Sequence, residues 1–397
     1  MSGVHPLNGV VRPYAWGSRT ALAQLQGRPA PTESPEAELW LGAHPDDPST
    51  LTGHHGPVSL ATVIADDPKG QLGAEVAAEF GPRLPYLMKV LAAAAPLSLQ
   101  AHPDAEYARL AFAAQQADPS LPRNYTDPFH KPEMLVALTP FAALCGFRAP
   151  EVSASVLETL ALPQLEPVVA ALRTGVEGLR EAVKLLLTWP GADRPALISA
   201  VVDAAGGIPA THPQAESFAL AIDLAGHYPG DPGVLVALLL NEVHLAPGEA
   251  IWMPAGNLHA YLNGTGVEIM AASDNVLRGG LTPKRVDVDE LLKVLRFEVL
   301  NDPVLPATPV APGIVTWKVP VREFALYRVE LDGTRPPTPV PASGPRIILG
   351  TAGDVYVAED HGTPVEVTRG TAAFAAAEAG QITLAGIGET FIAAVPA

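Results

Sequence analysis

The feature that most constrains the fold of this chain is a change of hydrophobic pattern in its middle. Short apolar runs separated by turn residues fill the first 150 residues and return at Glu242, and such runs are typical of β-strands. Between Ser153 and Leu240 the apolar residues instead recur at helical spacing, and prolines break one segment from the next. The sequence therefore predicts a mainly β protein that carries a helical insertion at residues 151–240.

A second β-rich stretch fills the C-terminal quarter of the chain. Pro303 to Pro312 has the composition of a linker. The strands predicted beyond it are Phe324–Leu331, Arg346–Leu349, Asp354–Ala358, Thr363–Thr368, Gln381–Ala385 and Phe391–Val395. Their short, regular spacing is typical of a sandwich or barrel. We therefore expect three units: residues 1–150 plus 241–300, the insertion 151–240, and a β domain at 301–397.

Two further helices are predicted outside the insertion. Asp104 can cap a helix that runs to Ala117, in which Tyr107 and Leu110 share a face. Acidic residues at the start of Asp287–Leu295 suit the positive end of a helix dipole.

The charge balance narrows the choice of partners. The sequence has 42 acidic and 25 basic residues, a formal net charge of −17, so it has no general attraction to nucleic acid or to anionic membranes. No apolar run approaches the length of about 18 residues that a membrane helix needs. Cys145 is the only cysteine, which excludes an intrachain disulfide and fits a reducing compartment. We expect a cytoplasmic protein, a monomer, with neither nucleic acid nor membrane as a partner.

Three separate segments carry residues that suit a metal ion. His259 follows the turn formed by Pro254 and Gly256 and starts a predicted strand. Gln100 and His102 are two residues apart in a second predicted strand, so their side chains would project from the same face of that strand. With Glu133 they offer two imidazoles, a carboxylate and an amide oxygen, a plausible set for a divalent metal such as Zn²⁺. The alternative is that these histidines are ordinary core or surface residues.

Basic residues are unevenly distributed. No lysine or arginine occurs between Arg194 and Arg278, and then Arg278, Lys284 and Arg285 appear within eight positions. This cluster beside the His259 segment predicts a site for a small anion. The alternatives are a salt bridge between Arg278 and Asp274, and a solvated surface cluster.

Seven segments together resemble the type I phosphomannose isomerase family of the cupin superfamily. They are Tyr14–Ser18, Glu38–Pro45, Leu84–Leu91, Pro96–Pro103, Asn124–Met134, Gly248–Asn263 and Ser273–Lys284. The resemblance implies a cupin-type β-barrel (jelly roll) catalytic domain, an inserted helical domain and a second, C-terminal cupin-like barrel. It implies one Zn²⁺ per chain, with Gln100, His102, Glu133 and His259 as ligands. The sequence beyond Pro303 follows the family only loosely, and we expect that barrel to lack metal ligands.

The resemblance also implies an activity, the zinc-dependent interconversion of D-mannose 6-phosphate and D-fructose 6-phosphate. Such aldose–ketose isomerisation moves a proton between C1 and C2 through an enediolate. By resemblance Arg278 acts in catalysis, and Ser98, Lys131, Glu268 and Lys284 surround the sugar phosphate. Trp16 is a candidate for the pocket wall. Glu268 can carry the proton if burial raises its pKa, and Lys131, His130 and Asp274 compete for that role.

Two other functions remain open at this point. A cupin that has kept sugar-phosphate binding without catalysis would bind fructose 6-phosphate and exchange no C1 proton with solvent. A metal-dependent cupin oxygenase would use two histidines and a carboxylate and consume O₂. The cationic cluster at Arg278 and Lys284 and the fourth ligand Gln100 favour the isomerase.

Overall fold

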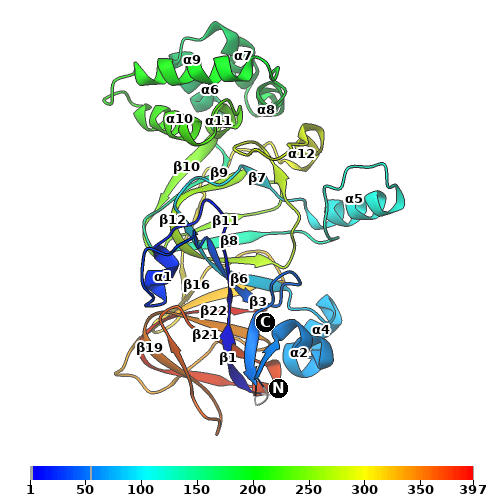
Figure 1. Ribbon diagram of the computed structural model, residues 1–397, viewed down its shortest axis with the longest axis vertical. Helices are drawn as coiled ribbons and strands as arrows, with labels where there is room; N and C mark the ends of the chain where they lie inside the picture. Colours follow the sequence, from blue (N-terminus) through cyan, green and yellow to red (C-terminus); the bar gives the residue numbers. More distant parts are fainter. Residues whose placement is uncertain (1–2, 54–55, 397) are drawn as a thin grey trace.

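A computed structural model describes residues 3–53 and 56–396. In Figure 1 the helices from the middle of the chain form one end of the molecule, and two antiparallel β-sheets lie below them. The N and C labels lie in the lower half of this view, far from the helical end. The protein is therefore mainly β with helices, as the sequence predicts.

The sheet nearer the helices, called the site sheet below, is built from strands within residues 10–42, 86–147, 240–278 and 304–305. Its longest strand, β12 (His259–Ala271), pairs with β7 and β9 along its first half and with β6 and β8 along its second. β12 is thus hydrogen-bonded to one group of strands at its start and to another group at its end, and the sheet curves into a barrel. The other strands are β2 (Val10–Arg12), β3 (Glu38–Gly42), β6 (Tyr86–Ala93), β7 (Gln100–Ala101), β8 (Glu133–Ala137), β9 (Phe141–Phe147), β10 (Leu240–Leu245), β11 (Ala250–Met253), β13 (Leu277–Arg278) and β14 (Val304–Leu305).

The second sheet, called the C-terminal sheet, takes most of its strands from residues after 307. Three N-terminal strands also belong to it, because β1 pairs with β21 so that Val4 lies opposite Ala375. The strands are β1 (Val4–Asn8), β4 (Thr50–Gly53), β5 (Gly56–Ser59), β15 (Thr308–Ala311), β16 (Ile314–Thr316), β17 (Ala325–Asp332), β18 (Thr338–Pro339), β19 (Arg346–Glu359), β20 (Val365–Thr368), β21 (Ala372–Ala375) and β22 (Ile382–Ala394).

The middle of the chain is helical. Its elements are α6 (Pro150–Thr159), η1 (Pro163–Leu165), α7 (Glu166–Leu172), η2 (Val176–Gly178), α8 (Leu179–Leu187), α9 (Arg194–Gly206), α10 (Ala215–His227) and α11 (Gly233–Ala237). In α8 the buried residues recur with the period of an amphipathic helix: Leu179, Ala182, Val183, Leu186 and Leu187. No helix in the described ranges combines the length and apolar character that crossing a membrane requires.

The other helices are α1 (Ala21–Leu25), α2 (Leu60–Asp66), α3 (Pro68–Leu72), α4 (Ala74–Phe80), α5 (Ala105–Ala117), α12 (Val288–Val294) and η3 (Ala377–Ala379). The two predicted helices outside the insertion are confirmed. Asp104 caps α5 by accepting a hydrogen bond from the Tyr107 amide, and Asp287 caps α12 in the same way from Glu290. Leu110 of α5 is half exposed, so that face of the helix does not form its buried side.

Strand alternation decides which side chains of the site sheet can form a site. Met88, Val136 and Ile269 point into an apolar core that they share with residues of the C-terminal sheet. Because successive side chains in a strand point to opposite faces, Lys89 and Glu268 point away from this shared core. The two sheets therefore pack against each other through one face of β6, β8 and β12, and the other face carries Lys89 and Glu268 together with a separate apolar cluster that includes Leu91 and Leu135.

The structure corrects two predictions for the C-terminal part. Pro303 to Pro312 is not a free linker, since β14 pairs with β11 and β15 pairs with β16. Both are edge strands, where a proline interrupts no ladder. The strands expected at 346–349 and 354–358 are one strand, β19, which continues past an irregularity between Gly350 and Ala352. The last two predicted strands are likewise merged in β22.

Candidate active site

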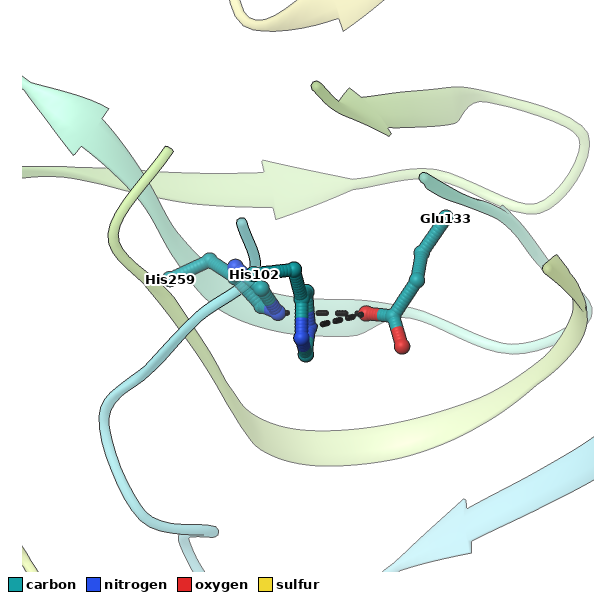
Figure 2. A group of neighbouring side chains, drawn as sticks. All are labelled: His102, Glu133 and His259. Carbon is teal, nitrogen blue, oxygen red and sulfur yellow. Dashed lines mark ion pairs between the residues drawn. The ribbon is translucent and has the colours of Figure 1, made fainter. Parts of the chain in front are cut away.

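Three of the predicted metal ligands lie together in the barrel (Figure 2). His102 follows β7, Glu133 begins β8 and His259 begins β12. Oε2 of Glu133 lies 3.4 Å from Nε2 of His102 and 3.2 Å from Nε2 of His259. Each of the three residues is at most 4% exposed. In the sequence these residues are spread over more than 150 positions, and the sheet brings their polar atoms together.

The backbone fixes which nitrogen of each histidine faces the cluster. Nδ1 of His102 lies 2.7 Å from the carbonyl oxygen of Asn275, and Nδ1 of His259 lies 3.1 Å from that of Asn257. A carbonyl oxygen can only accept, so both Nδ1 atoms carry the hydrogen and both Nε2 atoms keep a lone pair. Burial lowers the pKa of His102 to about 4, so its ring is neutral at pH 7.

This arrangement fits a metal ion. Nε2 of His102 is buried and makes no hydrogen bond within the described part of the chain. A buried lone pair without a donor, beside a second imidazole and a carboxylate, can be satisfied by a bound cation, and Zn²⁺ favours these ligands. Gln100, the fourth predicted ligand, lies on β7 with His259 and Arg278 as its partners across the sheet.

Lys131 completes the surroundings of the carboxylate. Its Nζ lies 3.0 Å from Oε1 of Glu133, whose other oxygen faces the histidines. Burial opposes ionisation of Glu133, but the charge of Lys131 holds its pKa well below the usual value. Glu133 is therefore a carboxylate, the form that binds a metal.

A cavity of about 840 Å³ lies next to the cluster. It is lined by six of the ten predicted site residues, namely Trp16, Ser98, Gln100, Lys131, Arg278 and Lys284. The structure thus brings together metal-ligand candidates and cationic side chains, as a phosphorylated substrate would require. Their individual roles stay predictions.

Arg278 is free to face a ligand. The salt bridge to Asp274 considered from the sequence is absent, since Asp274 instead lies 3.0 Å from Nε2 of His44. Within the described ranges the Arg278 guanidinium makes no ion pair or hydrogen bond, and burial lowers its pKa. Arg285 also lines the cavity but is paired with Asp287 at 2.8 Å.

Glu268 lies behind the cavity wall. Its Oε2 is 3.1 Å from Nζ of Lys89, and its Oε1 accepts a hydrogen bond of 2.7 Å from Tyr261. Burial raises the pKa of Glu268 although Lys89 opposes the shift. Lys89 lines the cavity and Glu268 does not, so Lys89 stands between this carboxylate and a bound ligand.

Several residues of the cavity wall have no role that is predicted from the sequence. Lys89 is one, and its signal is a single charge inside the apolar run of β6. Its carboxylate partners are Glu268 and Glu38, the latter at 3.7 Å. His44, Asp46 and Asp274 form a second group of possible metal ligands, with the two aspartates at the cavity. Only tertiary structure brings Asp274 to His44.

The barrel and the buried His–Glu–His cluster define the class of this protein, a metal-binding cupin. Residues 4–150 match the family described as phosphomannose isomerase type I, catalytic domain. The chain is 37% identical to mannose-6-phosphate isomerase of Escherichia coli over 389 residues, which covers 95% of this chain and 96% of that protein. It is 40% identical to the enzyme of the same name from Salmonella typhimurium over 322 residues, 80% of this chain and 81% of the relative.

Solved structures support the same family. A zinc-bound mannose 6-phosphate isomerase covers all of this chain with a TM-score of 0.91 and 33% identity, and is itself covered completely. A form bound with zinc and yttrium gives a TM-score of 0.90 at 33% identity, again over the whole of both chains. The chain therefore belongs to the type I phosphomannose isomerase family.

Proposed function

We propose that this protein is a zinc-dependent isomerase that interconverts D-mannose 6-phosphate and D-fructose 6-phosphate. The observation that carries the proposal is the buried cluster of His102, Glu133 and His259 beside a cavity lined by Lys131, Arg278 and other cationic side chains. The names of the relatives support the substrate pair, and the zinc-bound relative supports the metal.

Gln100, His102, Glu133 and His259 would hold one Zn²⁺ per chain. When bound, the ion supplies Lewis-acid polarisation of a substrate carbonyl. The hydrogen bonds to the carbonyls of Asn275 and Asn257 keep both imidazoles turned toward it. The ligands carry one negative charge in all, so the site keeps a net positive charge for an anionic substrate.

Arg278 stabilises the negative charge that develops on O1 and O2 as the enediolate forms. Its guanidinium has no partner within the described residues, so it is available to a substrate oxygen, and burial strengthens the interaction. Ser98 and Lys284 bind the phosphate, and Trp16 forms part of the wall. These residues concentrate positive charge at one cavity of a protein whose net charge is −17.

The proton moves between C1 and C2 by way of Glu268 or Lys131. Glu268 is supported by its raised pKa, which brings a buried carboxylate closer to neutral pH, and its proton would reach the cavity by way of Lys89, which contacts it at 3.1 Å. Lys131 is supported by its position in the cavity wall. Exchange of the C1 proton with solvent distinguishes the two candidates. If E268Q retains zinc but no longer exchanges the proton, Glu268 is the carrier, and the same result for K131M identifies Lys131.

The test of the proposed function is a coupled assay on mannose 6-phosphate with metal analysis of the same sample. We expect turnover, one zinc ion per chain, loss of activity on chelation and recovery with Zn²⁺. Full activity in metal-free protein would overturn the proposal. Binding of fructose 6-phosphate without proton exchange would instead identify a non-catalytic binding protein, and iron with O₂ consumption would identify an oxygenase.

Three further expectations complete the proposal. We infer a cytoplasmic monomer, which cell fractionation and light scattering test. The division into units at 1–150 plus 241–300, 151–240 and 301–397 also stays a prediction. Limited proteolysis would locate its boundaries, and β1 and β4 would remain with the C-terminal unit because they are hydrogen-bonded into its sheet.

A further inference from the structure

The loop that carries Lys131, residues 126–132, is held from two separate parts of the fold. On one side the buried amide of Asn275 donates hydrogen bonds of 2.8 Å to the carbonyls of Asp127 and Phe129. The Arg83 guanidinium covers the Phe129 ring at 3.6 Å from its centroid. These contacts come from the segments that flank β6 and β12 of the site sheet.

On the other side the loop is held by the C-terminal part of the chain. Nε2 of His130 lies 2.6 Å from Oε1 of Glu323. Glu323 lies in the irregular segment 317–324 that precedes β17, and both side chains are less than 25% exposed. Although burial opposes ionisation of Glu323, the hydrogen bond from His130 lowers its pKa, so it is a carboxylate.

Glu323 is itself fixed by its neighbour. Phe324 is 1% exposed and belongs to the core that the two sheets share. Its ring packs edge-on against Trp252 of β11, with 6.3 Å between centroids, and Trp252 lies opposite Met134 of β8. The Glu323 carboxylate that contacts His130 is therefore held in place by the packing of Phe324 against β11, which pairs with β8. Glu133 is the first residue of β8.

His130 and Lys131 are adjacent but face different surroundings. Lys131 lines the cavity and contacts Glu133, whereas His130 contacts Glu323 and is not among the residues that line the cavity. Restraining the His130 ring therefore fixes the direction in which the next side chain leaves the loop.

From this geometry we propose that Glu323 is a positioning residue for the isomerase reaction, acting through His130 on Lys131. The C-terminal part of the chain, which contains none of the four proposed metal ligands, thereby supports the catalytic barrel. The inference rests on the proposed function in one respect, that Lys131 takes part in the reaction.

The test compares Glu323→Gln with a matched control. Glu79→Gln removes the same charge from a carboxylate that pairs at 2.7 Å with Arg322, the residue next to Glu323, and that makes no hydrogen bond or ion pair with the loop within the described residues. We expect E323Q to lower kcat about tenfold, with KM, zinc content and melting temperature close to wild type. E79Q keeps the wild-type kcat.

A second comparison separates a shared contact from independent effects. If Glu323 acts through His130, the double variant E323Q/H130Q loses no more kcat than the more severe single variant. Additive losses, unchanged kcat in E323Q, or a loss accompanied by lower zinc content or melting temperature would each overturn the proposal. Wild-type protein without isomerase activity would refute the proposed function instead, so the two failures are distinguishable.

Discussion

Asn275→Ala is the substitution for which the structure predicts the most. This side chain is fully buried, and its amide links the Lys131 loop to the segment that carries Asp274 and Arg278. Its own main-chain carbonyl accepts the hydrogen bond from Nδ1 of His102. One truncation therefore acts on the loop and on the orientation of a proposed metal ligand, without removing any atom that would touch zinc or substrate.

The expected loss of stability follows from the hydrogen bonds removed. Three bonds of 2.8 Å are lost, from the Thr126 amide and to the carbonyls of Asp127 and Phe129. At about 1 kcal/mol of net stabilisation for each, the free energy of unfolding falls by about 3 kcal/mol. Because the carbonyl that orients His102 is no longer held, zinc affinity falls about 10- to 100-fold, as for other residues that orient metal ligands.

Urea denaturation and competition with a chelator measure the two quantities. Gln381→Ala is the control, because that amide binds the carbonyls of Val340 and Ile382 in the C-terminal sheet, away from the cluster. It should lose stability and keep the wild-type zinc affinity. An N275A variant that binds zinc as tightly as wild type would refute the reasoning, whatever its stability.

The remaining predictions concern the site and one buried thiol. His259→Ala should lose zinc and isomerase activity together, as measured by metal analysis and the coupled assay, because a proposed ligand is removed; activity without zinc would contradict this. Arg278→Ala should keep its zinc and lose about 100-fold in kcat, and an unchanged kcat would remove Arg278 from the mechanism. Burial raises the pKa of Cys145 to about 11, so about one thiol in a thousand is ionised at pH 8. A thiol reagent should react with the native protein far more slowly than with protein in urea, and equal rates would show that this part of the barrel opens readily.

The parts of the fold that were predictable are those with local signals. Asp104 sits where a helix cap belongs, and α5 begins at the next residue. The buried side of that helix was not predictable, because Gln115 is buried there to accept a hydrogen bond from the Tyr125 amide, a contact that apolar spacing cannot reveal. The pairing of β1 with β21 has no local signal either, since each strand alone fits many partners.

The candidate site also has a part that was predictable from the sequence and a part that was not. His102, Glu133 and His259 were selected by residue type and motif, and the barrel places them together. The position of Glu268 behind Lys89 depends on strand register, which pairs these two residues across β6 and β12. The contact between His130 and Glu323 joins residues 193 positions apart and follows from the packing of the two sheets. Sequence motifs name the residues, and tertiary packing decides which of them meet.

The position of β1 has a consequence for the order in which the protein can be assembled during synthesis. Val4 is translated 371 residues before its partner Ala375 becomes available. Until then β1 has no sheet edge to join on that side, and Glu323 has also to be translated before it can reach His130. A nascent chain can thus form the helical block first, whereas the C-terminal sheet and its support of the Lys131 loop must wait until the strands after residue 307 have been translated.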